Sequence, residues 1–278
     1  MSGTLYLCAT PIGNLEDMTL RVLRTLQEVD LIAAEDTRNT IKLLNHFEIK
    51  TPMTSYHEYN KIDKAAYLVN KLAEGMNIAL VTDAGTPGIS DPGEEIVKQA
   101  YAAGITVTSL PGACACVTAL TLSGLSTRRF AFEAFLPPDK KERRRILDAL
   151  KQETRTTIIY EAPHHLRATL QELYDTVGDR AITLCRELTK IHETVQCMTL
   201  SSAIAYFEEH PPKGEFVLVL EGKDPAELEQ EARQAWDSLT IEEHMEHYLS
   251  QNMTKKDAMK QVAKDRGVSK RDIYQALL

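Results

Sequence analysis

The first 110 residues alternate between short apolar runs and segments with helical spacing, and this alternation constrains the fold more than any other feature of the chain. The apolar runs, each of strand length, are residues 4–9, 30–34, 77–82 and 105–110. The segments with helical spacing are 17–28, 61–74 and 94–103. Such alternation is typical of a mostly parallel sheet with helices on both faces. We therefore expect an N-terminal α/β domain over residues 1–115, with its ligand sites at the carboxyl ends of the strands.

A second block follows, in which strand-like runs succeed each other more directly. The expected strands are 130–135, 156–160, 181–187, 193–200 and 215–221, and the expected helices are about 140–151, 164–175 and 201–209. We therefore expect a C-terminal α/β domain with a mixed sheet over residues 116–223. The predicted fold class is thus α/β, with two α/β domains.

Charge separates the last part of the chain from both blocks. Residues 224–246 hold eight acidic side chains and one basic one, whereas 253–278 hold seven Lys and Arg against three Asp. We expect 224–278 to be an acidic linker followed by a small helical tail, with short helices at 254–265 and 269–277 that resemble a helix-turn-helix unit.

The net charge of -8 argues against a protein that coats nucleic acid nonspecifically, but it leaves room for a local basic patch. The candidates for contact with RNA phosphates are Arg128, Arg129, Lys140, Lys141, Arg143, Arg144 and Arg145. The alternative is that this charge run is a solvated helix face.

Several other classes of protein are disfavoured. No apolar run has membrane length, and the N-terminus lacks the basic start of a signal peptide, so we expect a cytosolic protein. None of the five cysteines forms a CxxC pair, and we expect buried, reduced thiols. We expect no metal site, because His164 and His165 are adjacent and His244 and His247 have no evident partner ligands.

The loop at residues 82–93 is the richest in glycine and proline. Its sequence, TDAGTPGISDPG, exposes backbone and fixes its conformation, but it has no lysine that would hold a phosphate. It suits a ligand with flat and zwitterionic parts, such as S-adenosylmethionine. The alternative is an ordinary strand–turn–helix connection in which Ser90 or Asp91 caps the next helix.

Eight short motifs in order carry a resemblance to a known family. They are residues 10–15 (TPIGNL), 34–38 (AEDTR), 83–93 (DAGTP…SDPG), 110–112 (LPG), 135–137 (FLP), 160–161 (YE), 186–190 (RELTK) and 213–215 (KGE). In this order they resemble the bacterial small-subunit ribosomal RNA 2′-O-ribose cytidine methyltransferase I family of the tetrapyrrole-methylase superfamily. The resemblance covers about residues 3–222 and, more loosely, the tail.

The resemblance implies a class III methyltransferase fold with S-adenosylmethionine as cofactor, in the cleft between two α/β domains. It also implies a small-subunit ribosomal RNA or subunit as partner, and a homodimer. The residues that match the superfamily's cofactor contacts are Pro11, Ala84, Gly85, Thr86, Ile89, Cys114, Ala115 and Glu161, with a further, poorly aligned contact near 197–198.

The chain departs from the family pattern at three places. Ala113 stands where the family often has proline, and Ala134 where it usually has glycine. Thr86 stands where tetrapyrrole methylases commonly have the aspartate of Gly-Asp-Pro, which favours RNA over a porphyrin or corrin as substrate.

A ribose hydroxyl needs help to lose its proton before it can attack a methyl group. The candidates for a catalytic role are Glu35, Asp36, Arg38, Glu187 and Lys190, and His57 is a further candidate. Asp36 has an alternative role as a helix cap, and residues 186–190 could form a solvated strand face. Two rival functions stay open, a tetrapyrrole methylase and a catalytically silent RNA-binding module for ribosome assembly.

Overall fold

The computed structural model describes residues 2–237 and 239–278. The chain divides into two compact units. The first unit is Met1–Asp148 with Thr156–Glu221, and the second is Ala149–Arg155 with Gly222–Leu278.

The first sheet of the first unit is entirely parallel, with strand order β3-β2-β4-β1-β5. Its strands are β1 (Thr4–Cys8), β2 (Leu31–Ala34), β3 (Met53–Ser55), β4 (Ile78–Val81) and β5 (Thr106–Leu110). The helices between them are α1 (Leu20–Glu28), α2 (Thr37–His46), α3 (Lys61–Ala73) and α4 (Gly93–Ala102), with a short 3₁₀ turn at Leu15–Asp17.

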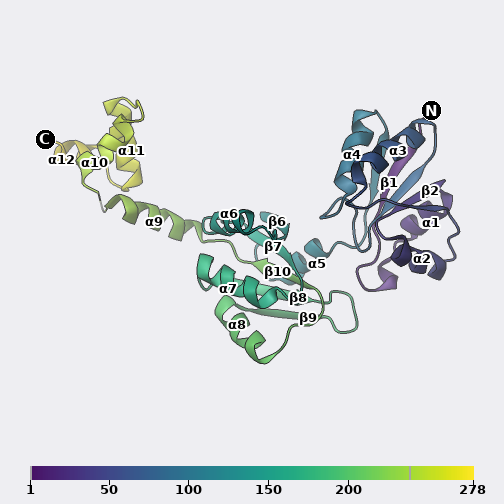
Figure 1. The fold of residues 1–278 in the computed structure, drawn as a ribbon. Helices are drawn as coiled ribbons and strands as arrows, with labels where there is room; N and C mark the ends of the chain where they lie inside the picture. The colour runs from purple at the N-terminus through teal and green to yellow at the C-terminus, as the bar shows by residue number, and fades with distance from the viewer. Residues whose placement is uncertain (1, 238) are drawn as a thin grey trace. The chain divides into compact units, whose positions relative to one another are not determined.

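Strand β4 shows why both faces of this sheet are covered. Its side chains alternate, so that Ile78 and Leu80 pack in the core formed with α3 and α4. Ala79 and Val81 pack in the opposite core, which includes α1 and α2. Figure 1 shows these helix pairs on either side of the strands. A strand buried on both faces reads as a continuous apolar run, which is how the sequence presents it.

The second sheet is mixed, with strand order β6-β7-β10-β8-β9. Only its β6–β7 pair is parallel among the described strand pairs. Its strands are β6 (Phe130–Phe135), β7 (Thr156–Glu161), β8 (Ala181–Arg186), β9 (Thr194–Thr199) and β10 (Phe216–Leu220). Its helices are α5 (Ala115–Leu122), α6 (Lys140–Leu150), α7 (Leu166–Val177) and α8 (Leu200–Glu209).

Helix α5 follows the last strand of the first sheet but packs on the second one. Its side chains Cys116, Ala119 and Leu120 share a core with Val217 and Val219 of β10. The loop between β5 and α5 therefore carries the chain from one sheet to the other.

The second unit is a helical cluster built from α9 (Pro225–Asp237), α10 (Ile241–Leu249), α11 (Lys255–Asp265) and α12 (Lys270–Ala276). Buried residues of α10, α11 and α12 form its core, among them Met245, Val262 and Ile273. The Arg266 guanidinium donates hydrogen bonds to the carbonyl oxygens of Trp236, Leu239 and Thr240. Arg266, which follows α11, thus ties that helix to the end of α9 and to the segment before α10.

The predicted fold class is confirmed: two α/β sheets with their helices, followed by a helical C-terminal part. The division of the first unit at residues 115/116 stays a prediction. Helices α2 and α5 and the short strand β3 were not expected, and α1 begins three residues later than the segment 17–28 suggested. Within the described residues, no helix has both the length and the apolar character needed to cross a membrane.

Candidate functional site

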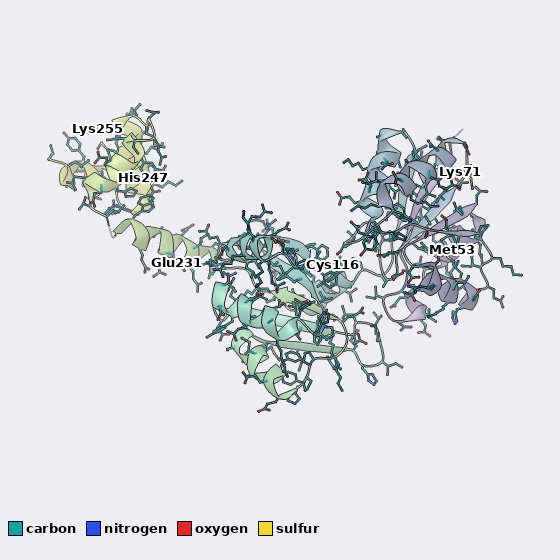
Figure 2. All side chains as sticks on the ribbon, viewed as in Figure 1. Met53, Lys71, Cys116, Glu231, His247 and Lys255 are labelled. Carbon is teal, nitrogen blue, oxygen red and sulfur yellow. The ribbon has the colours of Figure 1, made fainter. Side chains whose placement is uncertain are left out.

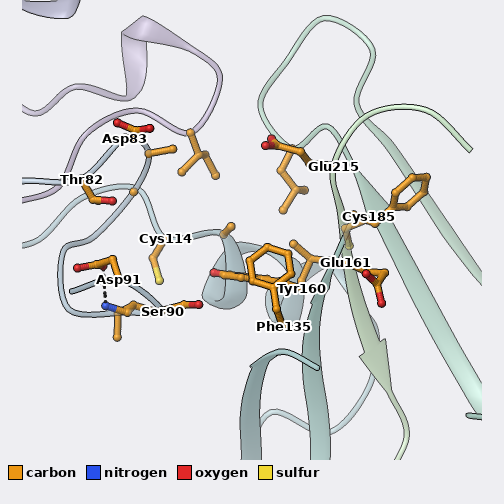
Figure 3. Close-up of a pocket in the computed structure, with 18 of the residues that line it drawn as sticks. Thr82, Asp83, Ser90, Asp91, Cys114, Phe135, Tyr160, Glu161, Cys185 and Glu215 are labelled. Atoms are coloured by element: carbon orange, nitrogen blue, oxygen red, sulfur yellow. Dashed lines mark hydrogen bonds between the residues drawn. The ribbon is translucent and has the colours of Figure 1, made fainter. Parts of the chain in front are cut away.

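The first unit contains a cavity of about 470 Å³, formed where loops after the strands of the first sheet face residues of the second (Figure 3). Loop residues Thr82, Asp83, Asp91 and Cys114 are drawn along one wall, and Tyr160 and Phe135 belong to the other. The residues around it are Ile12, Glu35, Thr82, Asp83, Ala84, Gly85, Thr86, Ile89, Ser90, Asp91, Cys114, Ala115, Phe135, Tyr160, Glu161, Ala162, Pro163, Cys185, Glu187, Leu188, Lys190, Glu215, Phe216 and Val217.

Most residues that the resemblance assigns to the cofactor line this one cavity. They are Ala84, Gly85, Thr86, Ile89, Cys114, Ala115 and Glu161. Pro11 lines a smaller neighbouring cavity instead. The structure thus brings together segments that lie up to 77 residues apart in the sequence, from Ala84 to Glu161.

Hydrogen bonds within the loop fix the glycine–proline segment. Gly85 exchanges two backbone hydrogen bonds with Thr10, at 2.9 and 3.0 Å. The Asp91 carboxylate accepts hydrogen bonds from the backbone N–H groups of Gly88, Ile89 and Gly93. Asp91 therefore holds the loop from inside, a wider role than capping the helix that follows.

Four non-glycine residues with left-handed backbone lie in or beside the cavity wall. Ser90 and Glu187 line the cavity, with φ of 66° and 52°. Thr189 (φ 65°) lies between two lining residues, and Ala134 (φ 51°) directly precedes Phe135. Such backbone is uncommon for residues with a Cβ and tends to gather where a ligand is held.

Two predicted catalytic residues, Glu187 and Lys190, form an ion-pair network at the cavity. The Lys190 Nζ lies 2.9 Å from both Glu187 Oε1 and Glu215 Oε2. Burial opposes the charge of Lys190, but these carboxylates outweigh it and raise its pKa. The Glu215 backbone N–H, together with Lys190, lowers the pKa of Glu187. Lys190 is therefore protonated and cannot accept a further proton. Glu187 is ionised, but its lowered pKa makes it a weak base for a hydroxyl.

Glu35, the third predicted catalytic residue that lines the cavity, organises the loop after β4. Its Oε2 accepts hydrogen bonds from Thr82 Oγ1, at 2.6 Å, and from the Asp83 backbone N–H, at 3.3 Å.

The remaining catalytic candidates have local partners away from the cavity lining. Asp36 caps α2, its Oδ1 accepting from the Arg38 backbone N–H at 2.8 Å. Arg38 pairs with the same carboxylate at 2.7 Å and lowers its pKa to about 2, while its own side chain is 87% exposed. His57 lies next to Asn60, with its Nε2 3.3 Å from the amide nitrogen. A catalytic role for these three residues stays a prediction that this arrangement does not favour.

Two cysteines lie at the start of α5. The Cys114 and Cys116 sulfurs are 3.4 Å apart, and the Cys116 backbone N–H donates to Tyr160 Oη at 3.1 Å. The hydrogen bond from the Cys116 thiol lowers the pKa of Cys114 to about 6 and raises that of Cys116. All five cysteines are free. The expected burial is right for Cys8, Cys116 and Cys185 but wrong for the half-buried Cys114 and the exposed Cys197, which lies on the edge strand β9.

Glu161 is almost fully buried at the end of β7, and a chain of hydrogen bonds holds its carboxylate. Its Oε2 accepts from Thr169 Oγ1 at 2.5 Å, and Thr169 in turn accepts from Arg143 at 2.8 Å. Arg143 also pairs with Glu172 at 2.7 Å, and its side chain is only 16% exposed. This ion pair disfavours a phosphate contact by Arg143, because the guanidinium would have to leave its partners.

The other basic candidates are exposed. Arg128 and Arg129 precede β6, and Lys140, Lys141 and Arg145 lie on α6. Arg144 is exposed but pairs with Asp148 at 3.1 Å, four residues along the same helix. Binding of RNA by these residues stays a prediction.

Several lining residues were not predicted from the sequence. Phe135, Tyr160 and Leu188 lie in motifs that carry the resemblance but were given no role, and Val217 is typical of an ordinary core residue of a strand. Asp83 did carry a signal, because it directly follows the strand that precedes the glycine–proline loop. Among the described residues, no group of three or more His, Cys, Asp or Glu is arranged to hold a metal ion.

Comparison with known proteins first defines the class. The family model for tetrapyrrole (corrin/porphyrin) methylases matches residues 4–204. The crystal structure of uroporphyrin-III-C-methyltransferase from Thermus thermophilus is similar over 78% of this chain and 94% of its own, with a TM-score of 0.56 and 21% identity. At this identity the likeness concerns the fold alone.

Closer relatives narrow the class. The protein named ribosomal RNA small subunit methyltransferase I from Halalkalibacterium halodurans is 52% identical over 272 residues, which cover 98% of this chain and 93% of that protein. The protein of the same name from Thermotoga maritima is 45% identical over 222 residues, which cover 80% of this chain and all of that protein. The chain therefore belongs to the ribosomal RNA small subunit methyltransferase I family, within the tetrapyrrole methylases.

Proposed function

We propose that this protein transfers a methyl group from S-adenosylmethionine to the 2′-oxygen of a cytidine ribose in small-subunit ribosomal RNA. Methylation of small-subunit ribosomal RNA is the activity in the name of relatives that match nearly the whole chain. The observation that carries the proposal is that seven of the eight residues matched to cofactor contacts by resemblance, all but Pro11, line one cavity. We further propose that the substrate is the assembled small subunit, that the location is the cytoplasm and that the protein acts as a homodimer.

The chemistry of the cavity wall fits S-adenosylmethionine. Its volume of about 470 Å³ lies within the range of about 300–1,000 Å³ that is typical of ligand sites. Apolar side chains such as Ile12, Leu188 and Val217 suit a flat adenine, and the loop around Gly85 offers backbone groups to polar ends. When bound, the cofactor supplies a methyl group on a positively charged sulfur. The carboxylate of Glu35 lies on the cavity wall and favours that charge.

A ribose oxygen suits this chain better than a base atom as methyl acceptor. Enzymes that modify a base extrude it and commonly stack it between aromatic side chains. Aromatic residues are only 6% of this chain, so shape and backbone contacts are the more suitable mode of RNA recognition.

Alkaline hydrolysis tests this proposal. Small subunits that lack the modification are incubated with the protein and labelled S-adenosylmethionine, and the RNA is then hydrolysed with alkali. The label should remain in a resistant dinucleotide, because a methylated 2′-oxygen cannot attack the neighbouring phosphate. A label released as a methylated mononucleotide would contradict the ribose as acceptor. Free ribosomal RNA as a parallel substrate tests the requirement for the assembled subunit.

A second candidate function is methylation of a tetrapyrrole, because the matching family model bears that description and the similar solved structure acts on uroporphyrin by name. The higher identity to ribosomal RNA methyltransferases favours RNA. A porphyrinogen added to the same assay separates the two, since label in the porphyrinogen and not in RNA would support the second candidate.

A further inference from the structure

A second, smaller cavity adjoins the cofactor cavity, and of the residues matched to cofactor contacts Pro11 alone lines it. Its volume is about 200 Å³, below the usual range for a whole ligand. It lies between the loop after β1, the first turns of α2 and the end of β4. The residues around it are Thr10, Pro11, Gly13, Leu15, Asn39, Thr40, Leu43, Thr82 and Asp83.

Thr82 and Asp83 line both cavities, so the two spaces meet at these residues. A group in the smaller cavity would therefore reach the cofactor cavity past the Asp83 carboxylate. Figure 3 shows Asp83 at the edge of the larger cavity, on the loop that follows β4.

The Asp83 carboxylate is oriented by α2. Its Oδ1 accepts from the Asp36 backbone N–H at 3.1 Å, and its Oδ2 accepts from the Asn39 side-chain amide at 3.3 Å. Each carboxylate oxygen can accept a further hydrogen bond. Asn39 also lines the smaller cavity, so the group that positions Asp83 is itself part of that wall.

We propose that the smaller cavity receives the sugar of the target nucleotide and that Asp83 is the catalytic base for its 2′-hydroxyl. This inference rests on the function proposed above and adds the acceptor subsite and the base. As the 2′-oxygen bonds to the methyl carbon, the carbon–sulfur bond breaks and its electron pair stays on sulfur. The hydroxyl proton passes to Asp83. A sulfonium and a carboxylate thus become a neutral thioether and a neutral acid, so charge and atoms balance.

The neighbouring charged groups favour Asp83 over the other carboxylates for this role. Burial, reinforced by the negative charges of Glu35 and Asp36, raises the pKa of Asp83, and the amide of Asn39 opposes this increase. The positive charge of Arg38 also interacts with Asp83, but Arg38 pairs with Asp36. By contrast, Asp36 has a pKa of about 2 and is a weak base. Glu35 is engaged with Thr82 and the Asp83 backbone.

The first test is Asp83→Asn, which keeps the shape of the side chain and removes its basicity. Turnover on small subunits should fall roughly 100-fold or more, as for loss of a general base. The dissociation constant for S-adenosylmethionine, measured by calorimetry, should stay within about twofold because the cofactor contacts remain. Turnover within threefold of the unsubstituted protein, or a loss of turnover matched by a loss of cofactor affinity, would overturn the inference.

The second test keeps Asp83 and changes its partner. Asn39→Ala removes a hydrogen bond that favours the ionised carboxylate, so the pKa of Asp83 should rise. Because the base must be ionised, activity rises with pH through this pKa, and the acidic limb of the pH–rate profile should move to higher pH. Asn45→Ala, an exposed substitution on the same helix, is the matched control and should leave the limb unchanged.

A readout without turnover comes from ¹³C-carboxyl NMR of the cofactor-free protein. The Asp83 signal should titrate above the ordinary aspartate range, and Asn39→Ala should raise its midpoint further. The inference would be refuted if the Asp83 signal titrated in the ordinary aspartate range, or if Asn39→Ala left its midpoint unchanged. If RNA treated with the unsubstituted protein yields no alkali-resistant dinucleotide, the proposed function itself is wrong. If both the unsubstituted protein and Asp83→Asn produce that dinucleotide at the same rate, the proposed function holds and only this inference is wrong.

Discussion

Cys114 illustrates how a single side chain takes its chemistry from its neighbours. It lines the larger cavity and directly precedes helix α5, and its sulfur lies 3.4 Å from that of Cys116. The N–H groups of the first helical turn also favour negative charge at this place. Cys8 and Cys185 lack such help, and burial raises the pKa of each to about 12.

We predict that Cys114 is alkylated selectively and that bound cofactor protects it. With a pKa of about 6, Cys114 is mostly thiolate at pH 7, and the thiolate is the reactive form. Its rate of reaction with iodoacetamide should therefore reach half its maximum near pH 6 instead of near pH 9. Peptide mass spectrometry across a pH series measures this rate.

The control for Cys114 is the exposed Cys197, which should react without protection by S-adenosylmethionine. Equal labelling of Cys114 with and without saturating cofactor would place the ligand away from α5.

At the scale of elements, the sequence predicted the strands well and some helices poorly, and the reasons differ. Strands such as β4 are apolar throughout because both faces are buried, and a short, continuous apolar run is typical of such a strand. Helix α2 is short and mostly polar, so its spacing was obscured by the charged motif that precedes it. Helix α5 is apolar on nearly every side, because it packs on the second sheet and also borders the cavity, so it lacks a polar face that would mark it.

The sequence predicted the part of the site that lies in a loop of unusual composition. It did not predict the part that lies on strands of ordinary composition. The composition of the glycine–proline loop predicted it as a binding loop. Tyr160 and Val217 lie on strands, and the tertiary structure places them at the cavity. The smaller cavity forms because α2 lies beside the loop after β4. It could not be predicted from the sequence because α2 was not predicted.

The glycine–proline loop leads to an element-scale prediction, that Gly85→Val weakens cofactor binding more than Gly88→Val. Both glycines have left-handed backbone, with φ of 90° and 86°, so both substitutions strain the loop similarly. A Cβ at Gly85 meets Ile12 at 3.3 Å beside the cavity, whereas one at Gly88 meets nothing within 4 Å. The dissociation constant for S-adenosylmethionine should rise at least tenfold in Gly85→Val, about 1.4 kcal/mol.

Thermal unfolding of both variants separates strain from ligand contact. Similar losses of Tm with different cofactor affinities support the placement of the ligand at Gly85. Equal affinities in two folded variants would refute it.

At the scale of the whole molecule, the chain joins the unit that contains the two cavities to a helical unit. Six exposed basic side chains of the second unit lie on α11 and α12: Lys255, Lys256, Lys260, Lys264, Lys270 and Arg271. Figure 2 labels Lys255, the first residue of α11. Arg266 is different, because it binds the end of α9 and His244 inside this unit. The second unit has its own core, and the relative from Thermotoga maritima matches over its whole length with only 222 residues of this chain.

We predict that deletion of residues 225–278 spares the cofactor site and weakens methylation of the small subunit. The cofactor cavity is formed by residues of the first unit alone, so affinity for S-adenosylmethionine and the thermal transition of that unit should persist. Turnover on small subunits should fall, and its dependence on salt should become shallower, because fewer phosphate contacts release fewer counterions.

The matched control is the full chain with Lys255, Lys256, Lys260 and Lys264 changed to Gln, which removes charge from α11 but keeps its core. If the tail serves RNA recognition, this variant should reproduce the shallower salt dependence. If the tail merely supports the first unit, the deletion should lower Tm and cofactor affinity together while the Gln variant behaves like the unsubstituted protein. A deletion that methylates subunits at the full rate with unchanged salt dependence would exclude both roles.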